Sequence, residues 1–213
     1  MEAQPPGDGA DIKEKLSFGK GEIMIIRKAE EDRYGEIRGF YHSLIDAMAG
    51  STAYVGWKKD IYPSPEFLAE SIRNGEMYYI AENGRIAAAM VLNHEYNEGY
   101  RRFHWQTEAS DDEILVIHAL GVHPDFARRG YAKAMVREAI RLAEEAGMKA
   151  IRLDVLEGNS PAEQLYTGFG FRYMATLKMY YEDTGWKNFM LYEYVIGSPG
   201  KTARERDQTN TGR

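Results

Sequence analysis

One stretch limits the fold of this 213-residue chain more than any other: the nine residues Ile114–Val122 (ILVIHALGV) are apolar almost without interruption. A run of this length is typical of a strand that is covered on both faces. After a short loop come residues 131–146, whose apolar side chains recur at helical spacing, with Gly147 placed to end the helix. A buried strand that leads into an amphipathic helix predicts a mixed α/β domain with Ile114–Val122 near the centre of its sheet.

The rest of the chain alternates strand-like and helix-like patterns. Strands are predicted over residues 23–28, 77–81, 86–92, 150–155, 171–181 and 188–195, and helices over residues 30–48, 65–73 and 160–167. Asn83 and Gly84 separate two of these strands and suit the positive φ angles of a tight hairpin turn. Residues 94–112 are predicted to form a loop or an irregular strand.

The composition narrows the class of protein. Apolar residues make up 44% of the chain, enough for one well-buried core, so we expect one domain over residues 22–196 between mobile polar tails at 1–21 and 197–213. The net charge of −6 argues against a whole surface that binds nucleic acid or an anionic membrane. We expect no membrane span, because no apolar run approaches ~20 residues.

The chain contains no cysteine. This excludes disulfides, thiolate metal sites and a cysteine nucleophile, and it fits a cytoplasmic protein. The N-terminus also has no basic start followed by an apolar stretch, so we expect no export signal. We assign no metal site to the chain.

The loop between the central strand and the helix is the first candidate site. Residues 121–135 (GVHPDFARRGYAKAM) contain two arginines and place Gly130 directly before the helix. The first backbone N–H groups of a helix have no intrahelical partner and lie at the positive end of its dipole, so they can hold a phosphate. Taken alone, the loop favours an ordinary strand–loop–helix connection with two solvated arginines.

A second stretch changes this interpretation. Residues 159–171 (NSPAEQLYTGFGF) follow the next predicted strand, and the two stretches together resemble the GNAT superfamily of N-acetyltransferases. The first motif of that family, V-x-P then R/Q-x-x-G-x-G/A, is matched by Val122, Pro124, Gly130 and Ala132. The second, N-x-x-A-x-x-L/F-Y then G-F, is matched by Asn159, Ala162, Leu165, Tyr166, Gly170 and Phe171. One position departs: the R/Q position falls on Ala127, and Arg128 and Arg129 follow it.

The resemblance implies a fold and a cofactor. The fold is a mostly antiparallel sheet of six to seven strands, splayed between strands 4 and 5 and flanked by about four helices. The cofactor is acetyl-CoA, which would lie in the splay with its pantetheine arm paired to strand backbone. Carried over to this chain, the cofactor-binding residues are Leu120, Gly121, Val122, Arg128, Arg129, Gly130, Tyr131, Ala132, Lys133, Asn159 and Tyr166. Of these, residues 128–133 would hold the pyrophosphate, and Gly121 is expected to ease a bulge in its strand.

Two residues are predicted to be catalytic. By the resemblance, Tyr166 is the general acid that gives a proton to the departing CoA thiolate. His118, in the otherwise apolar central strand, is a candidate general base, although the same pattern is equally typical of a core histidine. Asp112 and Glu113 at the start of that strand are rival bases, and proton transfer through water is a further alternative. His123 is expected at the surface.

The resemblance also places an acceptor pocket between the first two helices, the loop that joins them and the final hairpin. Aromatic and acidic residues gather in or near these segments: Tyr54, Trp57, Asp60, Tyr62, Glu95, Trp105, Asp111, Tyr181, Glu182 and Trp186. Aromatic rings with carboxylates suit a cationic amine. The same aromatics are equally typical of covered sheet edges or of a homodimer contact.

These observations predict an N-acetyltransferase that passes an acetyl group directly from acetyl-CoA to an amine of a small molecule or peptide. The missing cysteine fits direct transfer, since it excludes an acyl-cysteine intermediate. The alternative is a non-catalytic acyl-CoA-binding or regulatory module with the same fold. A nucleotide-binding module is disfavoured because the pattern G-x-x-x-x-G-K-S/T is missing.

Overall fold

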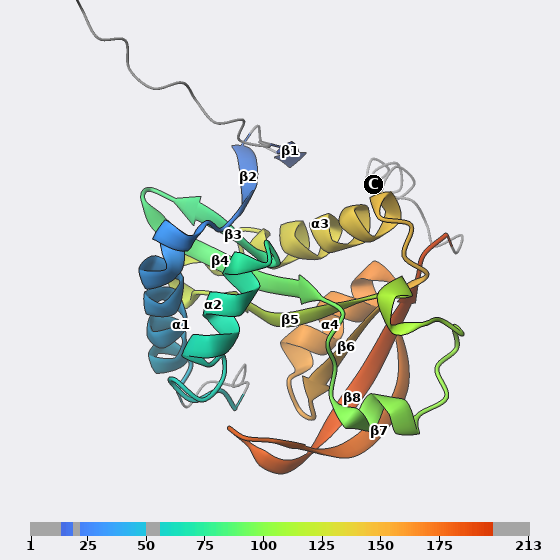
Figure 1. The fold of residues 1–213 in the computed structure, drawn as a ribbon. Helices are drawn as coiled ribbons and strands as arrows, with labels where there is room; N and C mark the ends of the chain where they lie inside the picture. The colour runs from blue at the N-terminus through green and yellow to red at the C-terminus, as the bar shows by residue number, and fades with distance from the viewer. Residues whose placement is uncertain (1–13, 19–21, 50–55, 198–213) are drawn as a thin grey trace, which may run out of the picture.

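The computed structural model describes residues 14–18, 22–49 and 56–197, which form one sheet with helices on both faces (Figure 1). In this part of the chain the sheet has eight strands in the order β1-β2-β3-β4-β5-β6-β8-β7. All neighbouring strands are antiparallel except β5 and β6, which run parallel. The strand bounds are Glu14–Phe18 (β1), Glu22–Lys28 (β2), Met77–Glu82 (β3), Arg85–Asn93 (β4), Ile114–Val122 (β5), Ala150–Leu156 (β6), Arg172–Tyr181 (β7) and Gly185–Val195 (β8).

Four α-helices and four short 3-10 turns complete the described fold. The α-helices are Tyr34–Met48 (α1), Pro65–Arg73 (α2), Tyr131–Glu145 (α3) and Ser160–Phe169 (α4). The 3-10 turns are Glu31–Arg33 (η1), Glu98–Arg102 (η2), Asp111–Glu113 (η3) and Pro124–Phe126 (η4). None of these helices is long and apolar enough to cross a bilayer.

Strand β4 separates the two helical layers. Its residues Ala88 and Met90 belong to one buried cluster, with side chains of α3 and α4. The alternate residues Ala89 and Val91 belong to the other cluster, with side chains of α1 and α2. Because successive strand residues point to opposite faces, α1 and α2 cover one face of the sheet and α3 and α4 cover the other. This double coverage explains why β4 and β5 are apolar along nearly their whole length.

Local sequence signals place several elements correctly. The Ser64 hydroxyl accepts a hydrogen bond from the Phe67 backbone N–H (3.1 Å), and Pro65 is the first residue of α2. Asn83 (φ 50°) and Gly84 (φ 76°) form the predicted tight turn between β3 and β4. These signals act within a few residues, so the sequence pattern alone predicts them.

The splay expected from the resemblance lies between β5 and β6, the fourth and fifth strands when counted from β2. The two strands pair only from Ile114↔Ala150 to Val116↔Arg152. Beyond these three pairs, β6 continues along β8, and the side of β5 that faces β6 has no strand partner among the described residues. The fold thus leaves a backbone edge open in the middle of its sheet.

A short strand adds to the predicted fold. Strands β2 to β8 match the six to seven expected, and β1 lies inside the tail predicted over residues 1–21, pairing with β2 from Glu14↔Ile26 to Phe18↔Glu22. That part of the tail prediction is corrected, because five residues within a polar segment are too few for a strand pattern to stand out. Residues 1–13 and 19–21 and residues 198–213 of the C-terminal tail lie outside the described residues, so their mobility stays a prediction.

Candidate active site

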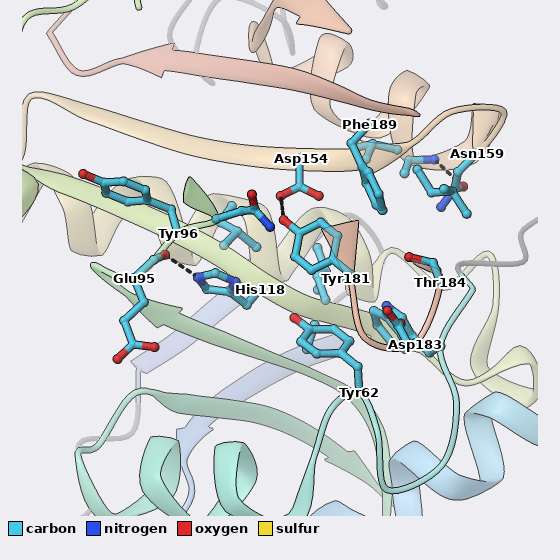
Figure 2. Close-up of a pocket in the computed structure, with 18 of the residues that line it drawn as sticks. Tyr62, Glu95, Tyr96, His118, Asp154, Asn159, Tyr181, Asp183, Thr184 and Phe189 are labelled. Atoms are coloured by element: carbon cyan, nitrogen blue, oxygen red, sulfur yellow. Dashed lines mark hydrogen bonds between the residues drawn. The ribbon is translucent and has the colours of Figure 1, made fainter. Parts of the chain in front are cut away.

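A cavity of about 290 Å³ opens where β5 and β6 separate. Its walls come from both strands, from α4, from the loop before α2 and from the β7–β8 hairpin, and Figure 2 shows the labelled side chains around it. The residues predicted from the sequence that line it are Trp57, Tyr62, Glu95, His118, Leu120, Asn159, Tyr166 and Tyr181. The cavity therefore brings together residues predicted for catalysis, for the cofactor and for the acceptor.

Tyr166 lies on α4, and the start of this helix fixes its position. The Asn159 side-chain oxygen accepts a hydrogen bond from the Ala162 backbone N–H (3.3 Å) and so caps the helix. The Tyr166 ring packs edge-on against Phe171, with 5.4 Å between ring centroids, and is buried. Burial and the Asp154 carboxylate raise the pKa of the Tyr166 phenol. The phenol is therefore protonated at neutral pH and is a proton donor at the cavity wall.

Asp154 on β6 is a cavity carboxylate that the sequence analysis missed. Its Oδ2 accepts hydrogen bonds from the Tyr100 hydroxyl (2.9 Å) and the Tyr181 hydroxyl (2.7 Å), and Figure 2 shows the bond from Tyr181. Burial raises the pKa of Asp154, although the hydrogen bonds from Tyr181 and Tyr100 act in the opposite direction. A signal for this residue was present in the sequence, because a carboxylate interrupts the apolar residues of a strand that leads directly to Asn159.

His118 on β5 also lines the cavity. Its Nε2 lies 2.9 Å from the Glu95 backbone carbonyl oxygen, so Nε2 carries the proton and donates it to that carbonyl. Burial lowers the pKa of His118 to about 4, which leaves the imidazole neutral at neutral pH with its lone pair on Nδ1. The ring meets Phe67 edge-on, with 6.1 Å between centroids. His118 can thus relay a proton, but its neutral form is a weak base.

The two rival bases lie away from the cavity. Glu113 accepts hydrogen bonds from the Ser110 backbone N–H (3.0 Å) and hydroxyl (2.9 Å) and pairs with Lys149 (2.9 Å). The hydrogen bond from Lys149 is the largest cause that lowers the pKa of Glu113 to about 2. Asp112 is exposed on η3, and neither carboxylate lines the cavity.

The residues predicted near the acceptor divide into two groups. Trp57, Tyr62, Glu95 and Tyr181 line the cavity, whereas Tyr54 lies outside the described residues. The other five line other parts of the structure: Asp60 contacts Arg38, Trp105 packs over Arg152 at 4.3 Å, Asp111 pairs with Arg101, Glu182 is exposed, and Trp186 is 61% exposed. These five residues were predicted near the acceptor because they lie in or near the segments expected to form its pocket. Their side chains do not line the cavity.

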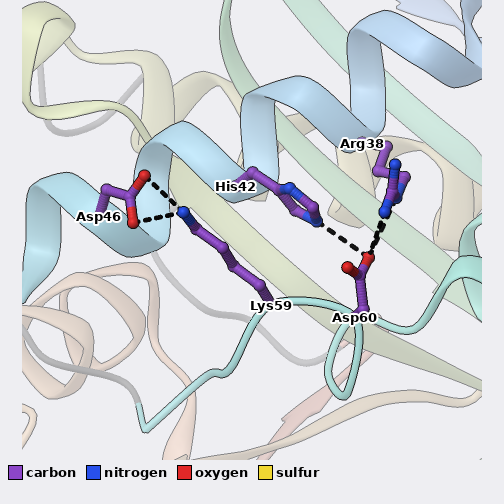
Figure 3. A network of polar contacts seen from close by, with 5 residues as sticks. All are labelled: Arg38, His42, Asp46, Lys59 and Asp60. Atoms are coloured by element: carbon purple, nitrogen blue, oxygen red, sulfur yellow. Dashed lines mark hydrogen bonds and ion pairs between the residues drawn. The ribbon is translucent and has the colours of Figure 1, made fainter.

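Ion pairs on the surface of α1 hold the loop that carries Trp57 and Tyr62 (Figure 3). The Asp60 carboxylate accepts hydrogen bonds from Arg38 Nε (3.0 Å) and contacts His42 Nε2 (3.0 Å). One turn away, Lys59 Nζ donates to Asp46 (2.6 Å). These contacts fix residues 59 and 60 against α1, so the neighbouring rings of Trp57 and Tyr62 are held at the cavity.

The start of α3 matches the geometry expected for anion binding. Gly130 (φ 84°) is the N-cap, and no side chain caps the helix. The Arg128 side chain is exposed, and its backbone also has a positive φ of 63°. Arg129 instead donates to Glu82 on β3 (2.9 Å), and the Tyr131 hydroxyl donates to the same carboxylate (2.5 Å). The side chains of Arg129 and Tyr131 are therefore occupied, which leaves their backbone N–H groups for the predicted role.

The bulge in β5 lies beside Gly121 rather than on it. Val91 of β4 pairs with His118 and Ala89 pairs with Gly121, so β5 carries one extra residue between these pairs. The extra residue is accommodated at Ala119, which has a positive φ of 49°. Gly121 serves another purpose, because a Cβ there would lie 2.4 Å from Cδ2 of Leu44 on α1. This glycine lets α1 approach the central strand.

A serine–histidine–aspartate row lies outside the cavity and does not have the chemistry of a nucleophilic triad. His123, which was predicted at the surface, is buried at 6% exposure because its ring lies between α1 and η4. Its Nδ1 accepts a hydrogen bond from the Asp125 backbone N–H (3.2 Å), and Nε2 lies 3.0 Å from the Ser43 hydroxyl. The Nδ1 lone pair is used by the backbone, so Nε2 carries the proton and cannot remove one from Ser43.

Residues 44–171 match the model of the Acetyltransferase (GNAT) family. The chain belongs to this family. The matched residues include β5, the loop before α3, and α4, and so contain the elements on which the resemblance was based.

Curated relatives of this GNAT chain include two kinds of acetyltransferase. A mycothiol acetyltransferase of Actinosynnema mirum is 33% identical over 69 residues, which cover 32% of this chain and 23% of that protein. A [ribosomal protein bS18]-alanine N-acetyltransferase of Haemophilus ducreyi is 34% identical over 70 residues, which cover 33% of this chain and 48% of that protein. The chain thus spans less than half the length of either relative.

Solved GNAT structures share the fold over nearly their full length. The GNAT family acetyltransferase of Listeria monocytogenes has a TM-score of 0.66 and 22% identity, covering 86% of this chain and 100% of that one. YncA of Salmonella typhimurium, solved with its cofactor acetyl-CoA, has a TM-score of 0.60 and 14% identity, covering 83% and 96%. At these identities the likeness establishes the GNAT fold of this chain.

Proposed function

We propose that this GNAT protein transfers the acetyl group of acetyl-CoA directly to an amine. The observation that carries the proposal is the cavity at the splay, which a half-buried carboxylate and a buried phenol, Asp154 and Tyr166, line beside an open strand edge. A base and an acid at the same cavity suit the transfer of a group from a thiol to an amine, because one proton must leave nitrogen and another must reach sulfur. The cysteine-free sequence supports the direct route and a cytoplasmic location.

The residues around the splay fit acetyl-CoA, which supplies the activated acetyl group as a thioester. Successive residues of a strand direct their N–H and C=O groups to opposite edges, and the His123 N–H donates to Ala87 of β4. In this register the side of β5 that faces the splay offers the backbone groups of Leu120 and Val122, on either side of Gly121. The uncapped start of α3 offers backbone N–H groups at residues 128–133 and the positive end of a helix dipole. Lys133 and the exposed Arg128 add positive charge there. An elongated anionic ligand therefore finds hydrogen-bonding partners along this whole path.

Asp154 is the residue best suited to accept the amine proton. Burial raises the pKa of Asp154 toward the range in which a base is effective, whereas burial lowers the pKa of His118 to about 4, away from that range. As the amine nitrogen bonds to the acetyl carbon, its proton passes to Asp154. As the carbon–sulfur bond breaks, Tyr166 gives its proton to the sulfur, and solvent returns the proton from Asp154 to Tyr166. His118 holds the neighbouring backbone through Glu95.

The deciding experiment measures thiol release from acetyl-CoA with a panel of amines. The panel contains alkylamines, free amino acids and peptides with a free N-terminus, and mass spectrometry identifies the acetylated product. We expect thiol release that depends on the amine. Tight CoA binding with no thiol release above the spontaneous rate for any acceptor would instead indicate the alternative, a non-catalytic acyl-CoA-binding module.

A further inference from the structure

The charges on the cavity wall all have one sign. Three carboxylates line it, those of Glu95, Asp154 and Asp183, and the lining residues include no lysine and no arginine. Asp183, at the tip of the β7–β8 hairpin, was not predicted from the sequence and has no part in the proton transfers described above. Buried charges in proteins are ordinarily paired. Glu95 is exposed, but Asp154 and Asp183 line this cavity without a lysine or arginine among its described lining residues, which favours a ligand that brings positive charge.

Asp183 shows this lack of a partner most clearly. It is only 4% exposed. Its hydrogen bonds come from its own turn, from Thr184 and from its own backbone, and the nearest cation, Lys58, acts at a distance without forming an ion pair within the described part of the chain. Burial is the largest cause that raises the pKa of Asp183, and the influence of Lys58 only partly opposes it.

The hairpin tip is held firmly in this position. A Cβ at Gly56 would lie 2.4 Å from Cγ2 of Thr184, so the loop before α2 packs directly against the tip. The same loop is tied to α1 through Lys59 and Asp60 (Figure 3). Asp183 is thus fixed at the cavity by two packed segments, which favours a binding role over that of a freely moving surface carboxylate.

Asp154 and Asp183 occupy separate places on the wall. The Tyr181 hydroxyl donates to Asp154 at 2.7 Å, and Figure 2 shows the ring of Tyr181 between Asp154 and Asp183, with the ring of Tyr62 beside Asp183. The two carboxylates nevertheless influence each other, since Asp183 contributes to the raised pKa of Asp154. A ligand that satisfies both carries two positive charges on one short chain, with apolar carbon against the two rings.

We propose that the amine acceptor is a linear diamine, whose reacting nitrogen lies at Asp154 and Tyr166 and whose distant ammonium binds the Asp183 carboxylate. This inference rests on the proposed acetyl transfer and names its substrate class. It disfavours free α-amino acids, because their carboxylate would face three acidic residues and no cation. It also distinguishes diamines from monoamines, because only diamines reach both carboxylates.

The test compares matched acceptors of one chain length: 1,5-diaminopentane, pentylamine and 6-aminohexanoate, each with acetyl-CoA. A charge-assisted hydrogen bond corresponds to about 10- to 100-fold. We therefore expect kcat/KM for the diamine to exceed that for pentylamine by at least ~10-fold, and 6-aminohexanoate to be the poorest acceptor. Equal values for the diamine and pentylamine, with both acetylated, would overturn the diamine assignment and leave the acetyl transfer standing. Preference for a peptide without a second cation would also overturn it.

The matched variants are Asp183→Asn and the control Glu182→Gln, an exposed carboxylate on the same turn. Asp183→Asn should raise KM for 1,5-diaminopentane by about 10-fold or more, and the ratio of kcat/KM for the diamine to kcat/KM for pentylamine should fall toward one. Calorimetric titration of the diamine into the CoA-bound protein should show the same loss of affinity without relying on turnover. Diamine affinity that is equal in wild type and Asp183→Asn would refute the role of Asp183. Absence of thiol release with every acceptor would refute the acetyl transfer itself.

Discussion

The same cavity wall suits the Asp154 carboxyl to act as a base and the Tyr166 phenol to act as an acid. Burial raises the pKa of both groups. For the carboxyl this moves the pKa toward neutrality, where a base is most effective, while Oδ2 keeps its two tyrosine donors. For the phenol, burial moves the pKa further from neutrality, so the hydroxyl stays protonated until the departing CoA sulfur accepts the proton. The same low-polarity wall thus makes one group a base and the other an acid.

Replacement of the phenol tests the acid. Tyr166→Phe keeps the ring that packs on Phe171 and removes only the hydroxyl, so we expect kcat to fall by about 10²-fold or more. CoA affinity measured by calorimetry should change by less than about twofold, because backbone groups provide most of the binding. An unchanged kcat in a variant with normal CoA binding would remove Tyr166 from the mechanism.

Replacement of the carboxyl tests the base through its pH dependence. In wild type, kcat/KM should fall as the pH drops through the raised pKa of Asp154, because protonation abolishes the base. Asp154→Asn should lower kcat/KM by about 10²-fold at neutral pH and remove this acidic limb. Asp112→Asn, a change at an exposed carboxylate outside the cavity, is the control and should keep the wild-type profile. An intact acidic limb in Asp154→Asn would assign the base elsewhere.

Asp154→Asn should lower activity but should raise the stability of the fold relative to wild type as the pH increases. Because the pKa of Asp154 is raised in the folded state, the folded protein binds more protons than the unfolded chain between about pH 4 and that raised value. This residue's contribution to the free energy of unfolding therefore decreases as the pH rises through the window. Asp154→Asn removes the decrease, so denaturant titrations should show the variant gaining stability relative to wild type as the pH increases.

The sequence predicted site residues that belong to a local motif and missed those defined by distant partners. Asn159 and Tyr166 lie on one short helix and follow from its motif. Asp154 is marked as a cavity residue by hydroxyl groups that are 54 residues before it and 27 residues after it in the chain. A carboxylate within an apolar strand was a local signal for Asp154, but no local pattern encodes the hydroxyl contacts that place it at the cavity, and Asp183 was missed because its position also depends on distant segments.

Among the elements, those stabilised by nearby residues were predicted closely. The caps of α2 and the β3–β4 turn follow from Ser64, Pro65, Asn83 and Gly84. The bulge in β5 was expected at Gly121 but lies at Ala119, because strand register is set by β4 and by the helices on both faces. The sequence shows that residue 121 is a glycine. It does not show that the close approach of α1 leaves no space for a Cβ there.

The close approach of α1 to β5 leads to a measurable effect on stability. In Gly121→Ala the new methyl group would press on Leu44, which is fully buried and has no room to move. We expect a loss of about 1–3 kcal/mol in the free energy of unfolding. Gly39→Ala is the control: Gly39 lies within α1, and a methyl group added there would meet nothing within 4 Å beyond its own helix backbone, so this change should stabilise the protein by about 0.5–1 kcal/mol. Equal stability of the two variants in urea titrations would contradict the assigned contact.

In the whole molecule, the cavity arises from segments that lie far apart in the sequence. The loop at Gly56 packs on the hairpin tip at Thr184, and the cavity beside this contact is also lined by the splayed ends of β5 and β6. The resemblance to the GNAT family predicted the mostly antiparallel sheet and the splay. It could not predict which side chains of the variable loops face inward, because that depends on how the loop before α2 and the final hairpin fit together.

The splay and the start of α3 act as one binding surface only in the assembled fold, so ligand binding should stabilise the whole protein. CoA at about 100 times its Kd adds about 2.7 kcal/mol to the free energy of unfolding, which corresponds to a rise in Tm of roughly 5–10 °C for a chain of this length. ATP at the same concentration should give less than half of that rise, because it has no pantetheine arm to pair with β5. Arg128→Ala should reduce the rise caused by CoA without abolishing it, since backbone N–H groups remain at the start of α3. Arg73→Ala, an exposed arginine at the end of α2 on the other face of the sheet, should leave the rise unchanged. A Tm that rises as much with ATP as with CoA would mean that the β5 edge takes no part in binding.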